Sequence, residues 1–503
     1  MAHESTTGVE VRFESPSGRW VLVTAVLGSA VVALDATVVN VALPAIGRDL
    51  HARVAGLQWI VDAYLVTLAA LILIGGSLGD HLGRRRVFVA GLWLFAASSL
   101  VSGAAPNLSL LIAGRAAQGV GGALLTPASL AIIQSTFRPE DRARAIGAWS
   151  GLGGLAAAIG PLAGGYLVDA LSWRAIFLLN LPVAAAAALV ALRHVPETVD
   201  VTVDAHIDVA GGALCAFGLA GVTFALIEAT SRGSVDAGVA SAAVAGLAAL
   251  GAFVAVEAQG RHPMLPLDIF SSHQFTGANL VTFAVYAALS GVFFMLVVFL
   301  QTVLKYSPLA AGASMLPVTL LMLALSARAG ALAQRIGPRL PMTAGPLVIA
   351  GGIFAMTRIG PGDHYATAVL PAVVVFGLGL TLTVAPLTAT VLAAADARHA
   401  GVASGVNNAV ARAAGLLAVA VLPLAAGLGG SDFRDPGAFT HGFHVAATVA
   451  ASLAAVGGVL AWLTIRDVDM TPVAAELTRT HCSIHAPPLR PAPAGTGPTG
   501  TAP

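Results

Sequence analysis

Long apolar runs dominate the chain from Trp20 to about residue 466 and limit what it can fold into. Short polar breaks separate these runs, and each run approaches the roughly 20 apolar residues that a helix needs to cross a bilayer. The runs are uniformly apolar instead of alternating with a period of two, which excludes a transmembrane β-barrel. We therefore predict an all-α polytopic membrane protein with about fourteen transmembrane helices. The expected spans are 20–43, 57–78, 87–105, 108–134, 145–168, 174–192, 208–228, 237–257, 275–301, 309–332, 340–358, 365–394, 400–427 and 441–465.

The composition excludes several classes of protein. Of the 503 residues, 57% are hydrophobic and 10% are charged, whereas soluble domains carry about 25% charged residues. A cytosolic enzyme is therefore excluded. The net charge of +1 provides no basic field for nucleic acid. Cys215 and Cys482 have neither metal-binding nor redox spacing, and the sequence contains no HExxH motif or recognisable catalytic set. We expect no enzyme activity, no cofactor, no metal and no nucleic-acid partner.

The basic residues are distributed unequally between the two sets of loops. If both termini are cytosolic, seventeen basic residues lie on the cytosolic side and seven on the other. This is the positive-inside bias of membrane proteins, and the flipped topology would reverse it. The first nineteen residues are polar and lack the basic region of a cleaved signal peptide. We therefore expect a multi-pass protein of the cytoplasmic membrane with both termini in the cytosol.

The chain contains an internal repeat. The segment GSLGDHLGRR, which begins at Gly76, matches GALAQRIGPR, which begins at Gly330, and Arg144 matches Arg398 in the same register. Parallel repeats are common in secondary transporters. Because equivalent halves need equal numbers of helices, we expect two six-helix bundles and one inserted helical pair. The predicted parts are a tail at 1–19, a first bundle at 20–193, the inserted pair at 194–258, a second bundle at 259–466 and a disordered tail at 467–503.

Asp35 is the strongest candidate for a functional group inside a span, because a charge in the hydrocarbon core is costly. It lies about 12 Å from the predicted end of its helix. Two interpretations are open. The carboxylate could be paired permanently with an arginine to hold two helices together, or its burial could let it bind and release a proton as access alternates.

Asp62 and Arg115 are further charges within spans. Asp62 lies about 7 Å from the predicted start of its helix, and it could share a cavity with Asp35 or be solvated at the helix mouth. Arg115 shares one helix face with Gln118 and Gly122. A guanidinium does not titrate usefully, so we expect Arg115 to tune a partner acid. We assign Asp35, Asp62 and Arg115 to proton coupling.

Polar residues on other spans suggest a substrate cavity. Arg412 shares a stripe of the span 400–427 with four residues, Gly401, Ser404, Asn408 and Gly415. Such a stripe either lines a cavity or holds helices together, and we favour a cavity because arginine is too costly for packing alone. The predicted lining residues are Thr37, Asn40, Trp59, Tyr64, Gln118, Gln301, Asn407, Asn408 and Arg412.

Several segments resemble motifs of a known family. The loop GSLGDHLGRRR from Gly76 is similar to a signature between a second and a third helix, and Arg115 with Gln118 is similar to a fourth-helix motif. The segment GPLAGG from Gly160 is similar to a fifth-helix motif associated with antiporters, although tight packing alone could explain it. Together with 34–44, 173–182, 300–308 and 401–408, these segments resemble the major facilitator superfamily, and within it the fourteen-span drug:proton antiporter branch of the EmrB and QacA type.

The resemblance implies a conformational gate. Asp80 would lie near the start of the span 400–427, where the helix dipole favours an anion, and Arg84 would pair with Asp141. The second-half loop has Gln334 in place of the acid, so the acidic gate would belong to the first half. The implied gate residues are Gly76, Asp80, Gly83, Arg84, Arg85, Asp141, Gly160, Pro161, Gly164 and Gly165.

The resemblance also implies a function. Inward proton flow would drive a hydrophobic or amphipathic small molecule outward, as in the antibiotic-resistance exporters of actinomycetes, and would confer resistance. The span 309–332 lacks the extra acid that some relatives place there for dicationic drugs. A proton-coupled importer of a metabolite is the alternative on the same fold, and a membrane enzyme or sensor is disfavoured. The implied partners are the drug, protons and the lipid bilayer, and a periplasmic protein partner is left open.

Overall fold

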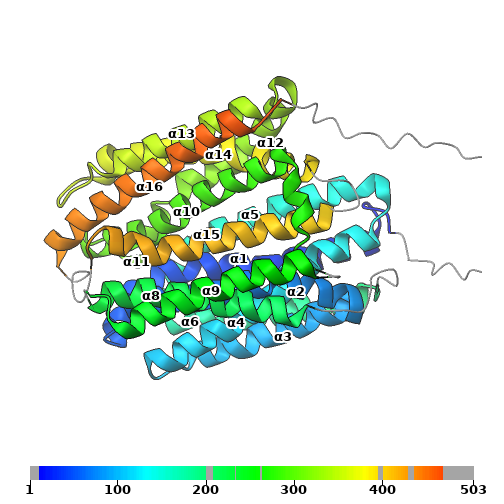
Figure 1. Ribbon diagram of the computed structural model, residues 1–503, viewed down its shortest axis with the longest axis horizontal. Helices are drawn as coiled ribbons and strands as arrows, with labels where there is room; N and C mark the ends of the chain where they lie inside the picture. The colour runs from blue at the N-terminus through cyan, green and yellow to red at the C-terminus, as the bar shows by residue number, and fades with distance from the viewer. Residues whose placement is uncertain are drawn as a thin grey trace, which may run out of the picture. The chain divides into compact units, whose positions relative to one another are not determined.

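The computed structural model describes residues 11–199, 208–232, 234–260, 263–394, 400–428 and 435–467 (Figure 1). These ranges fold largely into helices, and 14 helical segments are long and apolar enough to cross a membrane. The prediction of an all-α polytopic membrane protein is therefore confirmed. Of the predicted C-terminal tail, residues 468–503 lie outside the described residues.

In chain order we describe the helices as a first half, an inserted pair and a second half. The first half comprises α1 (Pro16–Asp49), α2 (Val54–Leu82), α3 (Arg84–Gly103), α4 (Leu108–Thr136), α5 (Pro139–Ala170), α6 (Arg174–Leu178) and α7 (Asn180–His194). The inserted pair comprises α8 (Val209–Arg232) and α9 (Ala237–Gln259). The second half comprises η1 (Leu267–Ser271), α10 (His273–Thr302), α11 (Pro308–Ala313), α12 (Leu316–Ile336), α13 (Arg339–Met356), η2 (Tyr365–Val369), α14 (Leu370–Ala393), α15 (Ala400–Ala425) and α16 (Pro436–Thr464).

Side-chain caps explain where several helices begin. The Asn107 side-chain oxygen accepts a hydrogen bond from the Leu110 N–H at the start of α4. The Ser272 hydroxyl accepts one from the Phe275 N–H at the start of α10. These side chains satisfy N–H groups that lack a partner in the first helical turn.

Helix ends extend beyond the apolar spans. The span of α1 was expected to end at residue 43, but the helix continues through Pro44 to Asp49. Hydropathy marks where the hydrocarbon core ends, whereas a helix can continue into the polar layer. Asp35 consequently lies about 21 Å from the end of its helix, deeper than the sequence suggested.

The two halves pack their helices in the same pattern. In the first half α1 packs on α5 and α7, and α4 packs on α2 and α3. In the second half α10 packs on α15 and α16, and α14 packs on α12 and α13. Small residues permit the close contacts, as where Gly121 meets the backbone of Gly91 and where Gly379 meets that of Gly345. This correspondence agrees with the internal repeat in the sequence.

The helices α8 and α9 stand outside that pattern and pack on each other (Figure 1). Gly221 of α8 lies against Gly246 of α9, which brings the two backbones close together. The helix α8 also contacts α2 of the first half and α15 of the second half. The inserted pair therefore touches both halves.

The two halves meet at the end where α1 finishes, which we call the closed end. Gln301 Nε2 of α10 donates a hydrogen bond of 2.8 Å to the carbonyl oxygen of Val41 on α1. The N–H of Leu309, at the start of α11, donates one of 2.9 Å to the carboxylate of Asp169 on α5. Both hydrogen bonds join one half to the other.

The opposite end, where α1 begins, lacks such close packing along α5. Among the described residues, no heavy atom lies within 4 Å of a Cβ added at Gly147, Gly151, Gly153 or Gly154. We call this the open end. The halves are thus joined at one end and separated along α5 toward the other.

Candidate functional site

Asp35 of α1 and Arg115 of α4 form an ion pair inside the first half. Arg115 Nη1 donates to Asp35 Oδ2, and Arg115 Nε donates to the carbonyl oxygen of Ile60 on α2 at 3.0 Å. Each of the two charged side chains is 1% exposed. A charge at such a place requires a partner, and here two residues that we assign to proton coupling provide each other's partner.

Three further side chains complete a group that we call the polar cluster: Asp35, Ser99, Arg115, Gln118 and Asn180. Gln118 Nε2 and Asn180 Nδ2 donate to Asp35 Oδ1 at 3.2 and 2.9 Å. The Ser99 hydroxyl oxygen accepts hydrogen bonds from both amides, at 2.7 and 3.3 Å. The N–H donors around Asp35 suit an ionised carboxylate, which only accepts hydrogen bonds.

Two members of the polar cluster carry no assignment from the sequence. Asn180 begins α7 and belongs to the segment 173–182 that resembles a family motif, so it had a sequence signal but no predicted role. Ser99 lies in an apolar stretch of α3, and only the tertiary contact reveals its part in the cluster.

Two aromatic rings pack against the Arg115 guanidinium. The guanidinium carbon lies 4.3 Å from the centroid of the Tyr64 ring on α2 and 5.9 Å from that of Phe177 on α6. Such stacking stabilises a desolvated guanidinium. The Tyr64 hydroxyl is buried and has no hydrogen-bond partner in the described part of the chain.

Asp62 of α2 is the second buried acid. Its exposed fraction is 0%, and neither carboxyl oxygen has a hydrogen-bond partner among the described residues. The idea that Asp62 is solvated at the helix mouth is therefore wrong, because α2 begins at Val54 and places Asp62 about 12 Å inside.

The position of Asp62 follows from a neighbour on the same helix face. Gln58, one turn earlier, donates from Nε2 to the carbonyl oxygen of Val419 on α15 at 2.9 Å. Asp62 thus lies at the contact between α2 of the first half and α15 of the second. An ionised carboxylate without a partner is costly there, so these surroundings suit the neutral form that carries a proton.

The remaining residues predicted to line a cavity are dispersed. Thr37 and Asn40 donate to carbonyl oxygens of their own helix one turn earlier. The Trp59 ring lies 6.3 Å from that of Phe224 on α8, so it contacts the inserted pair. Of the predicted set, Tyr64 and Gln118 lie at the polar cluster.

The predicted cavity residues of the second half are also separated from one another. Gln301 joins the halves at the closed end, as described above. Asn407 Nδ2 donates to Asn279 Oδ1 and Thr282 Oγ1 on α10, and Asn408 Nδ2 donates to a carbonyl oxygen of its own helix. Arg412 is half-buried in the middle of α15.

The turn between α2 and α3 lies at the open end. Gly83 adopts φ 106°, which favours glycine, and Asp80 pairs with Arg84 at 2.7 Å. The carboxylate of Glu197, which follows α7, accepts the Arg85 backbone N–H at 3.0 Å and lies 3.5 Å from the Arg85 guanidinium. Glu197 was missed in the sequence, although it is an acid directly after a predicted span.

Of the other predicted gate residues, Gly76 lies on α2 and the rest lie on α5. Asp141 Oδ2 accepts a hydrogen bond from the Phe13 N–H at 2.9 Å, which joins the segment before α1 to the start of α5. The expected pairing of Asp141 with Arg84, and the expected contact of Asp80 with the start of α15, stay predictions. Gly76, on α2, has its nearest neighbour in Pro127 of α4.

Glycines of α5 allow helices to approach closely. Gly160 and Gly164 leave no room for a Cβ against Thr37 and Val38 of α1. Gly165 leaves none against the start of α11 in the second half. Pro161 lies inside the same helix. Near the closed end, this segment therefore packs α5 against α1 of its own half and against α11 of the second half.

The sequence profile of the Major Facilitator Superfamily matches residues 25–419. The chain belongs to this superfamily. It is 35% identical over 463 residues to the puromycin resistance protein pur8 of Streptomyces alboniger, covering 90% of this chain and 92% of that protein. It is 32% identical over 424 residues to the tetracenomycin C resistance and export protein of Streptomyces glaucescens, covering 84% of this chain and 77% of that protein.

Solved structures show the same superfamily fold. The crystal structure of a D-xylose-proton symporter superposes with a TM-score of 0.65 at 14% sequence identity, covering 90% of this chain and 99% of that chain. At this identity the similarity concerns the fold. Its membership of the Major Facilitator Superfamily makes this chain a transporter, and the fold builds it from membrane-spanning helices.

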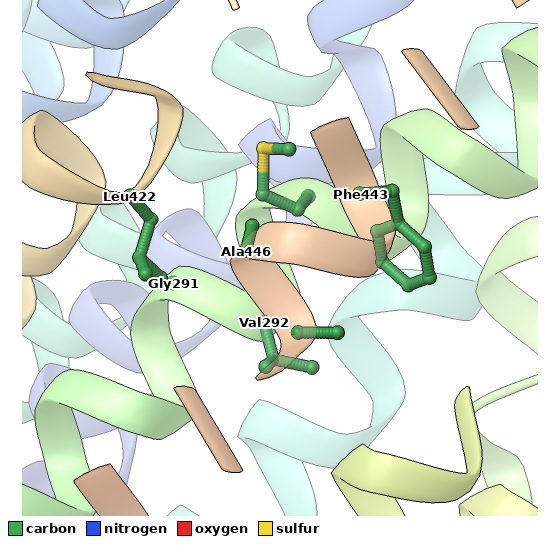
Figure 2. A pocket seen from close by; sticks show the side chains of 7 residues that line it. Gly291, Val292, Leu422, Phe443 and Ala446 are labelled. Atoms are coloured by element: carbon green, nitrogen blue, oxygen red, sulfur yellow. The ribbon is translucent and has the colours of Figure 1, made fainter. Parts of the chain in front are cut away.

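An apolar pocket of this superfamily member lies in the second half, between α10, α15 and α16 (Figure 2). It does not coincide with the predicted cavity, because its lining contains no polar side chain and none of the predicted site residues. The lining residues are Gly291, Val292, Met295, Leu422, Phe443, Ala446 and Ala447.

Proposed function

We propose that this protein exports a hydrophobic or amphipathic small molecule, an antibiotic, in exchange for protons and thereby confers resistance to it. The similarity to resistance and export proteins along 84–90% of the chain supports the export of a drug. The alternative, a proton-coupled importer of a metabolite, is distinguished below by the direction of transport.

We place the open end of the molecule in the cytosol and the protein in the cytoplasmic membrane, with both termini cytosolic. The arginines at 84–86 at the start of α3 and Arg144 near the start of α5 support this orientation, because basic residues favour the cytosolic side. In this orientation the structure faces inward. The moving parts of the cycle are the bundles 20–193 and 259–466, with the pair 194–258 between them.

The burial of Asp62 without a partner is the observation that carries proton coupling. Closure of the extracellular side brings α2 against α15 and removes Asp62 from water, so closure requires a proton on this carboxyl. In the outward-facing state the carboxyl meets water and takes its proton from outside. Loss of that proton to the cytosol favours reopening of the extracellular side, now with the drug bound.

The Asp35–Arg115 ion pair is in contact with α2, the helix that carries Asp62. Arg115 donates to the Ile60 carbonyl of α2 and stacks on Tyr64 of α2, so it contacts residues on both sides of Asp62 in sequence. A proton on Asp35 would remove the negative partner of Arg115 and weaken its position. We therefore assign to Asp35 and Arg115 the transmission of protonation to α2.

Transport in everted membrane vesicles from a host that lacks its own pumps tests the proposal. An antibiotic panel first identifies exported compounds by resistance that an uncoupler removes. Acidifying the vesicle lumen should then drive accumulation of those compounds. Asp62→Asn should abolish this accumulation while the protein remains in the membrane. Glu228→Gln, which changes an acid of α8 paired with Arg232, should transport as the wild type does.

Each other outcome of this experiment has a clear meaning. Proton-driven movement in the opposite direction would establish an importer. Unchanged accumulation by Asp62→Asn would remove Asp62 from the coupling mechanism. Resistance that an uncoupler does not diminish would show that protons do not drive export.

A further inference from the structure

Arg412 is a cation without a counter-ion in the middle of the membrane-spanning region. It lies about 18 Å from the start of the 26-residue helix α15. In the described part of the chain it takes part in no hydrogen bond or ion pair, unlike Arg115, which has Asp35. It is half-buried, and from this depth its side chain does not reach a lipid headgroup.

Contacts above and below Arg412 show what it faces on α10. One turn toward the open end, Asn407 of α15 bonds to Thr282 of α10. One turn toward the closed end, Gly415 of α15 lies against Ser290 of α10. Tyr286 lies midway between Thr282 and Ser290, so it is level with Arg412.

Two contacts between α15 and α2 show which turn of α2 lies level with Arg412. Gln58 of α2 contacts Val419, and Leu73 of α2 lies against Gly405, with the two helices antiparallel. Interpolation between these contacts places Arg412 level with the turn that holds Tyr64. Arg412 therefore faces the region between the halves.

Within the described ranges, no acid near this region is free to neutralise Arg412. The helices α10 to α16 contain no aspartate or glutamate. On the helices α2 and α8, which also pack on α15, Asp80 pairs with Arg84 and Glu228 pairs with Arg232. The remaining acid is Asp62, whose surroundings suit its neutral form. Asp35 is already neutralised by Arg115. The central region thus carries a net positive charge.

We propose that Arg412 binds an acidic group of the substrate, so that the exported molecule is an amphipathic weak acid with a carboxylate or an ionised enol or phenol. This inference rests on the proposed export function. A guanidinium forms paired hydrogen bonds with a carboxylate, and the half-buried ring of Tyr286, level with Arg412 on α10, offers an apolar surface beside it. A cationic compound gains no such partner and is repelled by Arg412.

The charge of the substrate changes the driving force. When one monoanion leaves in exchange for one entering proton, both movements carry charge in the same electrical direction. When one monocation leaves in exchange for one proton, no net charge moves. A membrane potential that is negative on the cytosolic side therefore drives export of the acid even without a pH gradient.

The test uses purified full-length protein in liposomes and three pyrene probes with a similar aromatic body. These are pyrenebutyrate, its methyl ester and pyrenebutylamine. The wild type should transport the acid at least about tenfold better than the ester or the amine, as expected when a charged hydrogen-bond partner is gained. An imposed potential without a pH gradient should drive transport of the acid. Arg412→Gln should abolish the preference and Arg412→Lys should retain it. Arg328→Gln, which changes an exposed arginine of α12, should leave it unchanged.

The wild-type comparison needs no variant, so a folding defect of Arg412→Gln leaves the inference testable. Equal transport of acid and ester by the wild type, or preference for the amine, would overturn it. A preference that survives in folded Arg412→Gln would also overturn it. If the wild type exports an antibiotic in a proton-dependent manner but ignores pyrenebutyrate, the inference fails and the proposed function stands. Absence of any proton-linked export removes the proposed function itself.

Discussion

The Arg115 guanidinium donates to the Asp35 carboxylate where both side chains are hidden from solvent. The two residues come from α1 and α4, and amides from α4 and α7 complete the coordination of the carboxylate. Water does not compete at this site, so the pair is stable until one partner loses its charge. In the proposed cycle Asp35 is the partner that would take up a proton, because a guanidinium keeps its own.

Asp35→Asn should destabilise the protein and abolish proton-driven export. Removing one member of a buried ion pair leaves Arg115 unpaired, which costs about 3–5 kcal/mol. The double variant Asp35→Asn/Arg115→Gln leaves no lone charge and should recover part of the lost stability. Melting temperatures in detergent measure this difference. A double variant that melts at or below the temperature of the single variant would contradict the argument.

The separation of α2 from α15 at the closed end should depend on pH through Asp62. Spin labels at Arg53→Cys and Ala425→Cys, in a background with Cys215→Ser and Cys482→Ser, report this distance. Acidic pH protonates Asp62 and should favour the short distance, whereas raising the pH should populate a longer one. Asp62→Asn should keep the short distance at every pH. A pH response that persists in Asp62→Asn would assign it to another group.

Glu197→Gln should loosen the α2–α3 turn. The Glu197 carboxylate accepts the Arg85 N–H and pairs with Arg85 and Arg86. Glutamine keeps an acceptor oxygen but loses the charge, so the cost should be part of the about 1.5–3 kcal/mol that a hydrogen bond to a charged group contributes. Faster hydrogen exchange at residues 83–86 would show the effect. Glu14→Gln is the matched control, because the Glu14–Arg144 pair is exposed and surface ion pairs contribute little. Equal effects of both variants would refute a special role for Glu197.

Gly160→Ala should separate α5 from α1 and reduce export. A Cβ at Gly160 overlaps the Thr37 hydroxyl, and overpacking of this kind costs about 1–3 kcal/mol. Gly153→Ala is the control on the same helix, since a Cβ at Gly153 meets no described atom within 4 Å. It should be neutral or stabilise the helix by about 0.5–1 kcal/mol. Melting temperatures that fall equally for both variants would contradict the packing argument.

The start of α9 should weaken only in strong acid. The Val239 N–H, and next the Arg232 side chain, hold the pKa of Asp236 below its usual range. Because this pKa is depressed, its stabilising contribution is complete above the ordinary pKa and disappears as pH falls through the lowered value. Hydrogen exchange at Val239, corrected for intrinsic rates, should accelerate only in that acidic window. Asp236→Asn retains a capping oxygen and should remove the pH dependence.

The number and kind of helices follow from the sequence, because the length and uniformity of the apolar runs leave few alternatives. The resemblance also singles out Asp35 and Arg115, and the structure places them in contact. Their mutual contact depends on helix rotation. A helix that is apolar on all sides carries little information about which face meets a neighbour, so Ser99 and Trp59 could not be placed from their spacing.

Segments outside the spans were less predictable still. The continuation of α1 to Asp49 and the contact of Glu197 with Arg85 depend on tertiary contacts and on the polar layer, neither of which hydropathy reports. Asp62 illustrates the same limit. Its sequence position suggested a helix mouth, whereas the folded chain buries it completely.

The helix α8 has a consequence for proton leakage. It lies on both α2 and α15, and together they bury Val66, Ala69, Ala70, Leu219 and Leu416 beside the turn of α2 that holds Asp62. Without α8, the contact between α2 and α15 would lie directly against lipid, with no protein layer between it and the bilayer. In the proposed transport cycle, α8 would insulate this flank electrically, so that protons would reach Asp62 only from the two aqueous sides of the membrane in turn.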